Sequence, residues 1–185
     1  MKKGFSLAEM LVVLVIVGVI ITLTINTVKQ TSEKSIKTLY KAAYNNVETV
    51  VNELINDTAL YPGAEFTDGT FCDNFFDKVN YIGAYSCAAP SVPAASGDTN
   101  TPSGSTSNGM RWYFMQDAFA AANCYTGAPA GAECIHIYVD VNGGKGKNVN
   151  TDPTSDTVDI LSIYIFKTGK VAVEPGTPEA DYLTQ

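Results

Sequence analysis

The sequence has little of what common enzymes require. Only one histidine occurs among its 185 residues, and its four cysteines do not have the spacing of a zinc site. The residues that zinc sites and Ser-His-Asp catalysis need are therefore scarce, and no nucleophile lies in an evident pattern with a base. We interpret the chain as a structural or binding protein and not as an enzyme, with a length that suits one domain plus appendages.

Basic residues are also scarce in most of the chain. The whole sequence has 12 basic and 19 acidic residues, of which residues 1–41 contain six lysines and two glutamates, a net charge of +4. Residues 42–185 then carry 6 basic and 17 acidic residues, a net charge of −11. Because phosphate contacts need clustered Lys and Arg, we expect no direct nucleic-acid binding.

A long apolar run stands close to the start of the chain. Residues 5–25 read FSLAEMLVVLVIVGVIITLTI, which matches the roughly 20 apolar residues that a membrane-spanning helix needs. Lys2 and Lys3 precede the run and favour a cytoplasmic N-terminus, although the lysines of residues 29–41 on the far side weaken this orientation. A secretory signal peptide has its small residue after the apolar run, whereas here Gly4 precedes it. Cleavage after Gly4 would keep the helix in the mature protein.

Glu9 is an ionisable residue inside this apolar run. Such residues are costly within a membrane and usually have a partner. If the chain is cut after Gly4, the new α-amino group of Phe5 in one subunit could pair with Glu9 of a neighbour. The alternative is that Glu9 reaches the membrane interface by snorkelling.

The string KKGFSLAEMLVVLVIVGVI resembles the N-terminal signature of type IV pilins and of the pseudopilins of type II secretion systems. The resemblance implies cleavage after Gly4 by a prepilin peptidase, N-methylation of Phe5, and pairing of Glu9 with a neighbouring N-terminus. It implies three partners: that peptidase, other copies of the chain or related pilins in a filament, and an inner-membrane assembly platform. Gly18 stands where the family often has glycine. Asn26 replaces a proline found in many type IV pilins, so local melting of the helix is less expected here.

The helix is predicted to continue beyond the apolar run, because no Pro or Gly occurs between Thr22 and Asp57. Apolar residues follow at steps of three and four, with Ser32 filling one gap, which is typical of an amphipathic helix that ends near Asn56. These residues are Val28, Ile36, Leu39, Ala43, Val47, Val50 and Leu54. The predicted organisation is a leader at 1–4, a transmembrane and filament-core helix at 5–27, its amphipathic continuation at 28–56, and a globular head at 57–185.

The head contains all four cysteines, which favours two disulfides in an exported compartment. Of the three ways to pair them, we prefer Cys72–Cys87 with Cys124–Cys134, because both close short loops. Buried free thiols are the alternative. Residues 88–109 are rich in Pro, Ser, Gly and Thr and are predicted to form a mobile surface loop.

Strands are predicted at residues 111–116, 134–141, 158–166 and 170–173. Alternation in the second strand directs Ile135, Ile137 and Val139 to one face and leaves His136 on a solvent face, where we interpret it as an exposed strand residue. The predicted fold class is α+β, with a long N-terminal helix packed against a small antiparallel β-sheet.

The run DVNGGKGKN, residues 140–148, is the best candidate for a metal site. Calcium prefers oxygen ligands on flexible loops, and the candidates are Asp140, Asn142, Asp152 and Asp156. The run lacks the pattern of an EF-hand, and Lys145 and Lys147 would repel a cation. Major pseudopilins bind calcium in a loop of similar location, but their aspartates do not align with these. The alternative is a turn with solvated charges.

Two functional hypotheses follow. The first is a structural subunit of a type IV pilus-like or type II secretion pseudopilus filament. It would be a single-pass protein of the inner membrane with its head outside the cytoplasm, and then part of a periplasmic or extracellular filament. The second is a monomeric membrane-tethered ligand-binding module, which predicts an uncleaved N-terminus and no self-assembly.

Overall fold

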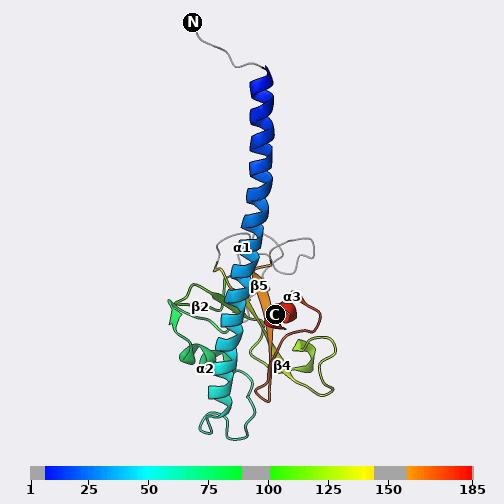
Figure 1. The fold of residues 1–185 in the computed structure, drawn as a ribbon. Coiled ribbons are helices and arrows are strands. Elements are labelled where there is room, and N and C mark those ends of the chain that lie inside the picture. Colours follow the sequence, from blue (N-terminus) through cyan, green and yellow to red (C-terminus); the bar gives the residue numbers. More distant parts are fainter. Residues whose placement is uncertain (1–6, 89–100, 144–157, 185) are drawn as a thin grey trace. The chain divides into compact units, whose positions relative to one another are not determined.

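The computed structural model describes residues 7–88, 101–143 and 158–184, with the side chains of these residues except Glu9 and 23–30. The chain divides into two compact units, Met1–Ser35 and Ile36–Gln185, and we describe each by itself (Figure 1). Both units contain part of helix α1, Leu7–Ile55, which is 49 residues long. The α+β fold class is confirmed.

Unit 2 contains a six-stranded sheet in the order β1-β2-β3-β4-β5-β6, in which all neighbours are antiparallel. The order along the sheet is the order along the chain, so each strand pairs with the next one. The strands are β1 (Tyr81–Ile82), β2 (Gly104–Thr106), β3 (Arg111–Phe114), β4 (Cys134–Asp140), β5 (Ile160–Phe166) and β6 (Val171–Ala172). Two short helices, α2 (Phe71–Lys78) and α3 (Pro178–Thr184), and the 3₁₀ turn η1 (Ala121–Asn123) complete the unit.

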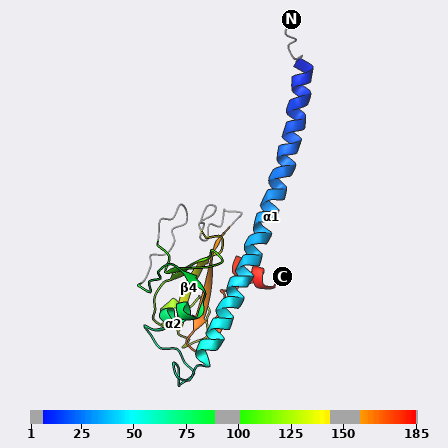
Figure 2. The same ribbon diagram turned by 90° about the vertical axis from the view of Figure 1, so that its left-hand side faces the viewer.

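The core of unit 2 forms between α1 and one face of the sheet (Figure 2). The predicted stripe of α1 is buried at Ile36, Ala43, Val47, Val50 and Leu54, whereas Leu39 is half-buried. Val28 lies outside the described side chains. Tyr40 and Val51 are fully buried as well and were missed, because the helical face that meets the sheet is wider than a single row of residues. The opposing strands contribute Ile135, Ile137, Val139, Leu161, Ile163 and Ile165.

A cluster of aromatic rings attaches α2 to the sheet. Phe75 lies 5.5 Å from Trp112 and 5.2 Å from Phe114, measured between ring centroids. A Cβ atom on Gly104 would collide with the ring of Phe76, so the close approach of β2 to α2 requires a glycine. No helix was predicted here, because eight residues are too few to show a clear helical period.

The prediction of a mobile loop at 88–109 is wrong at its C-terminal end. Residues 104–106 form β2, and Thr106 Oγ1 accepts a hydrogen bond from Trp112 Nε1 at 3.2 Å. Ser103 is buried, and its Oγ accepts from the backbone N–H of Phe114 at 2.9 Å. The side chains of Ser103 and Thr106 thus accept hydrogen bonds from residues of β3 instead of from water. Residues 89–100 of this loop lie outside the described residues.

The four predicted strands correspond to β3, β4, β5 and β6, each slightly shorter than predicted. The predicted exposure of His136 is wrong. Its ring stacks on Tyr164 at 4.2 Å and lies 4.3 Å from Tyr138, so aromatic neighbours on the same face of the sheet cover it. Burial lowers the pKa of His136 to about 4, because the charged imidazolium is disfavoured there.

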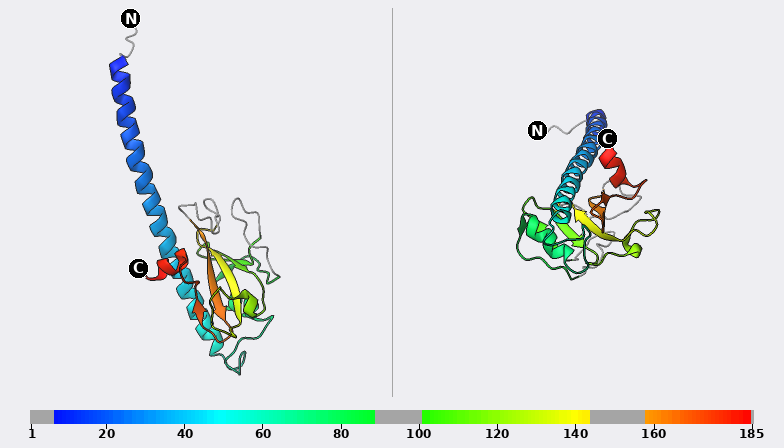
Figure 3. Two further views of the ribbon diagram at one scale, coloured as in Figure 1. Left: turned by 90° about the vertical axis from the view of Figure 1, so that its right-hand side faces the viewer. Right: turned by 90° about the horizontal axis from the view of Figure 1, so that it is seen from below.

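Two side chains cover the edge of the sheet where β5 extends beyond β6. Strand β6 pairs with Tyr164 and Ile165 and ends there. At Ser162 the backbone N–H donates to Glu179 Oε1 at 3.1 Å, and the carbonyl accepts from the Tyr40 hydroxyl at 2.8 Å. The Ser162 hydroxyl also donates to Glu179 Oε1 at 3.1 Å. Figure 3 shows α3, which carries the buried Glu179, beside α1.

The disulfides join Cys72 to Cys87 and Cys124 to Cys134, with Cα–Cα distances of 5.8 and 5.1 Å. These are the pairs that the short-loop argument preferred. The first ties α2 to the chain after β1, and the second closes the loop that precedes β4. The second acts on residues 124–134, a segment that has few large apolar side chains of its own.

Candidate processing and assembly segment

The described side chains of residues 7–21 in α1 are almost all apolar, and all of them are exposed. Leu7 is 85% exposed and Leu14 is 72% exposed. The others are Met10, Leu11, Val12, Val13, Val15, Ile16, Val17, Val19, Ile20 and Ile21, all at least 45% exposed. A helix that is apolar all round is normally buried in a membrane or in a larger assembly. This segment therefore needs a membrane or neighbouring molecules to cover its apolar side chains.

The boundary between exposed and buried apolar residues is sharp. No described side chain between residues 7 and 35 is buried, whereas Ile36 is 6% exposed and Tyr40 is fully buried. The first contacts between α1 and the core therefore begin at Ile36. The same helix has two roles: its later turns complete the core of unit 2, and its earlier turns present apolar surface.

Gly18 lies within this exposed stretch. A Cβ atom added to Gly18 would meet nothing within 4 Å, so packing within the chain does not require a glycine there. The Thr22 hydroxyl donates to the Gly18 carbonyl oxygen at 2.9 Å, which satisfies this polar side chain within the helix. The small residue leaves the backbone open to close approach by another helix.

The residues predicted for processing and pairing are only partly within the described structure. Gly4 and Phe5 precede the first described residue, and Glu9 lies in α1 with its side chain outside the description. The pairing of Glu9 with a neighbouring amine stays a prediction. Among the described residues, no helix has the length and hydropathy of a membrane span.

The predicted calcium loop begins at the end of β4. Asp140 Oδ1 accepts the backbone N–H groups of Asn142 at 3.2 Å and of Gly143 at 2.8 Å, which is the hydrogen bonding of an Asx turn. The Asn142 side chain donates to Asp159 Oδ2 at 2.8 Å. Asp152 and Asp156 lie outside the described residues, and within the described part no cluster of three His, Cys, Asp or Glu could hold a metal.

A melting experiment tests the calcium hypothesis directly. A calcium loop predicts that Ca²⁺ raises the melting temperature of the protein relative to EDTA, and that Asp140→Ala abolishes this rise. An unchanged melting temperature in the parent protein would remove the hypothesis and leave the Asx turn as the role of Asp140.

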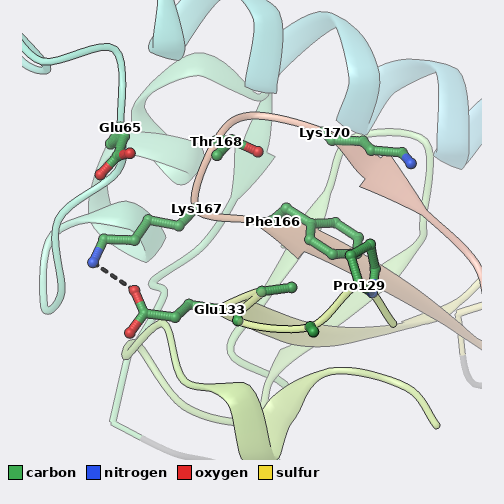
Figure 4. A pocket seen from close by; sticks show the side chains of 10 residues that line it. Glu65, Pro129, Glu133, Phe166, Lys167, Thr168 and Lys170 are labelled. Atoms are coloured by element: carbon green, nitrogen blue, oxygen red, sulfur yellow. Dashed lines mark hydrogen bonds and ion pairs between the residues drawn. The ribbon is translucent and has the colours of Figure 1, made fainter. Parts of the chain in front are cut away.

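A surface pocket of about 340 Å³ lies where three loops of unit 2 meet (Figure 4). Its lining includes Glu65, the turn at 129–133 and the turn that joins β5 to β6. Lys167 Nζ pairs with Glu133 Oε2 at 2.6 Å, and the hydrogen bond raises the pKa of Lys167. The Lys170 ammonium lies 5.7 Å from the centre of the Phe166 ring. The lining groups do not include a nucleophile paired with a base, and sequence reasoning missed the pocket because its loops are far apart in the chain.

Comparison with known families finds one match. Residues 1–25 match the family described as the prokaryotic N-terminal methylation motif, so the chain carries the prepilin-type signal of type IV pilins and pseudopilins. This confirms the resemblance that the N-terminal residues suggested. Comparison with curated proteins and with solved structures finds no match.

Proposed function

We propose that this chain is the precursor of a structural subunit of a type IV pilus-like or type II secretion pseudopilus filament. The observation that carries the proposal is the overlap of two features in one segment. The methylation motif covers residues 1–25, and the apolar side chains of residues 7–21 are exposed. A processing signal and an uncovered apolar helix at the same place are what a self-assembling subunit needs.

In this function the precursor is anchored in the inner membrane through α1, with Lys2 and Lys3 in the cytoplasm. The prepilin peptidase cleaves after Gly4, and the new N-terminal Phe5 is methylated. Because the cut precedes the apolar run, the helix stays with the mature chain. The two disulfides agree with a head outside the cytoplasm, where oxidising conditions maintain such bonds.

Assembly transfers α1 from lipid into a bundle of identical helices. Lipid tails are as apolar as Leu and Val, so burial of apolar area contributes little to this step, and packing and polar contacts between helices must drive it. Pairing of Glu9 with the Phe5 amine of a neighbour would neutralise two charges that are costly in an apolar environment. The same pair would fix the axial offset between subunits.

Mass spectrometry on the protein from membrane and filament fractions tests this function. The expected mass corresponds to a chain that begins at methylated Phe5 and lacks four hydrogens because of its two disulfides. A chain that begins at Met1, in a host with an active prepilin peptidase, would contradict the proposal and favour the membrane-tethered binding module.

A further inference from the structure

One edge of the sheet in unit 2 exposes apolar side chains. Strand β1 is the outermost strand, and Tyr81 and Ile82 are 38% and 55% exposed. Within the described part of unit 2, Leu60 is the other large apolar residue that is exposed. Natural proteins usually cover or charge such edges, and an exposed apolar patch with a polar rim is typical of an interaction surface.

Aromatic rings form a rigid support beneath this edge. Tyr85 stacks on Phe76 with ring centres 4.8 Å apart, and Tyr81 meets Tyr85 edge to face at 5.1 Å. Phe76 is fully buried and belongs to the core, so these rings connect the edge to the interior of the unit. The surface is therefore held in place before any partner arrives, which lowers the entropic cost of binding.

Two carboxylates lie beside the rings. Asp73 and Asp77 are exposed on α2 and stand one helical turn apart, so they share a face of the helix. Both act on Tyr85: desolvation is the largest cause that raises the pKa of Tyr85, the negative charges of Asp77 and Asp73 raise it further, and Asp73 accepts a hydrogen bond from its hydroxyl. We call Asp73, Asp77, Tyr81, Ile82 and Tyr85 the edge patch. Its aromatic faces and carboxylates together suit a cationic partner with some apolar surface.

The chain itself carries a surface of this chemistry. Lys37 and Lys41 lie one turn apart on α1 and are half-buried, and Leu39 between them is also half-buried. The spacing of the two ammonium groups along a helix equals the spacing of Asp73 and Asp77 along α2. The charge distribution points the same way: without the leader, residues 5–41 carry four lysines and two glutamates, a side-chain net charge of +2, whereas the remainder carries −11.

We propose that the edge patch of one copy binds the Lys37–Lys41 turn of α1 in a neighbouring copy. This inference rests on the proposed function, and it adds a second contact between subunits, outside the apolar segment of α1. The two surfaces differ, so the contact is heterologous. A heterologous contact continues from copy to copy and generates a filament unless its rotation closes into a ring, whereas an isologous one closes as a dimer.

Carbodiimide cross-linking of the full-length, processed protein tests the contact, because this reagent joins a carboxylate to a lysine amine in direct proximity. Purified filaments and detergent-dispersed monomers are cross-linked side by side, and their peptides are analysed by mass spectrometry. The expected product is a peptide that joins Asp73 or Asp77 to Lys37 or Lys41 in filaments and is absent from monomers. Filaments whose edge patch joins other lysines, or another protein, would overturn the proposal.

Charge exchange gives an independent readout. Asp73→Lys with Asp77→Lys, or Lys37→Glu with Lys41→Glu, should each lower filament yield by about tenfold, and the four substitutions together should restore most of it. The control is Glu53→Lys with Asp181→Lys, which makes the same change in charge at exposed acids outside the edge patch. Equal losses in the control, or no recovery in the fourfold variant, would contradict the contact.

Asp73 lies in the first turn of α2, where a positive charge opposes the helix dipole and could prevent folding. A variant that exchanges only one pair of charges, Asp77→Lys with Lys41→Glu, and leaves Asp73 in place is therefore measured as well. The melting temperature of each variant is recorded. If the wild-type protein forms no filament at all, the proposed function fails. If the wild type assembles and only the cross-link and the rescue are missing, the edge-patch contact alone fails.

Discussion

His136 shows how a single half-buried residue links the stability of the head to pH. Its imidazole is stacked between Tyr138 and Tyr164, and its buried Nε2 makes no hydrogen bond within the described part of the chain. The pKa is lowered from 6.5 to about 4 by burial. Above pH 6.5 the residue is neutral in both folded and unfolded chains. Between these two pKa values only the unfolded chain binds a proton at His136, so the free energy of unfolding falls as the pH falls.

We therefore expect the free energy of unfolding to decrease by up to about 3 kcal/mol from this residue between pH 6.5 and pH 4. Urea unfolding at a series of pH values, for the parent and for His136→Phe, measures it. The carboxylates titrate in both proteins, so the difference between the two curves isolates the histidine. Parallel curves would show that His136 stays accessible to protons in the folded state.

Gly104 is a residue at which one added methyl group should matter. A Cβ there would collide with the ring of Phe76 and approach Tyr85, so Gly104→Ala should lower the free energy of unfolding by about 1–3 kcal/mol. Gly63→Ala is the matched control, because nothing lies within 4 Å of a Cβ at that position. Both are measured by chemical denaturation of the full chain in detergent. Similar stability of the two variants would mean that α2 moves away at little cost.

At the scale of elements, the open edge of β5 depends on α3. Glu179 is 2% exposed and replaces a neighbouring strand by accepting both the backbone N–H and the hydroxyl of Ser162. Glu179→Ala leaves these donors buried without an acceptor, and we expect a loss of about 2 kcal/mol in the free energy of unfolding. Asp181→Ala, at an exposed position of the same helix, should change stability far less. Comparable losses would contradict a special role for Glu179.

Much of the architecture could be predicted from local patterns. The helical spacing from Ile36 to Leu54 and the alternation of Ile135, Ile137 and Val139 both reflect one buried face, and a buried face leaves a clear period in the sequence. Strands β1 and β2 and helices α2 and α3 were missed because each is short, and their stability comes from contacts with distant parts of the chain, such as Phe75 of α2 with Trp112. Burial of His136 depends on Tyr164, which belongs to another strand, so alternation in β4 alone could not reveal it.

The two candidate surfaces differ in how far the sequence predicts them: it predicts the processing segment but not the edge patch. The processing motif is continuous in the chain, and its residues suffice to identify it at 1–25. The edge patch draws on residues 73–85, for which no helix or strand was predicted, and only the order of the strands places Tyr81 and Ile82 of β1 at the edge of the sheet. A single sequence does not encode locally where a residue lies relative to the sheet, so the edge patch could not be predicted from it.

For the whole molecule, the central prediction concerns Glu9. Glu9→Ala should leave membrane insertion, cleavage after Gly4 and methylation of Phe5 intact, because it changes neither the leader nor any apolar residue of the run. Filament yield should fall by about tenfold or more, since the neighbouring amine then loses its partner. Electron microscopy of sheared filaments measures assembly, and the mass of the N-terminal peptide measures processing.

Glu33→Ala is the control for this experiment, because it removes an exposed acid from the same helix outside the apolar run. It should assemble normally. Filaments of normal abundance from Glu9→Ala would reject the pairing and would leave helix packing around Gly18 as the source of register.

The agreement between strand order and chain order has a consequence for biogenesis. Every strand after β1 pairs with the strand that precedes it, so under the proposed function the head can grow by addition of one strand at a time as the polypeptide emerges on the far side of the membrane. No strand must wait for a distant partner, which keeps the unfolded intermediate short-lived. Strand β6 and helix α3 follow β5 in the chain, and their arrival closes the edge of the growing sheet at Ser162, on the side away from β1. A nascent head would thus be protected against aggregation with its neighbours only once these final elements have been exported.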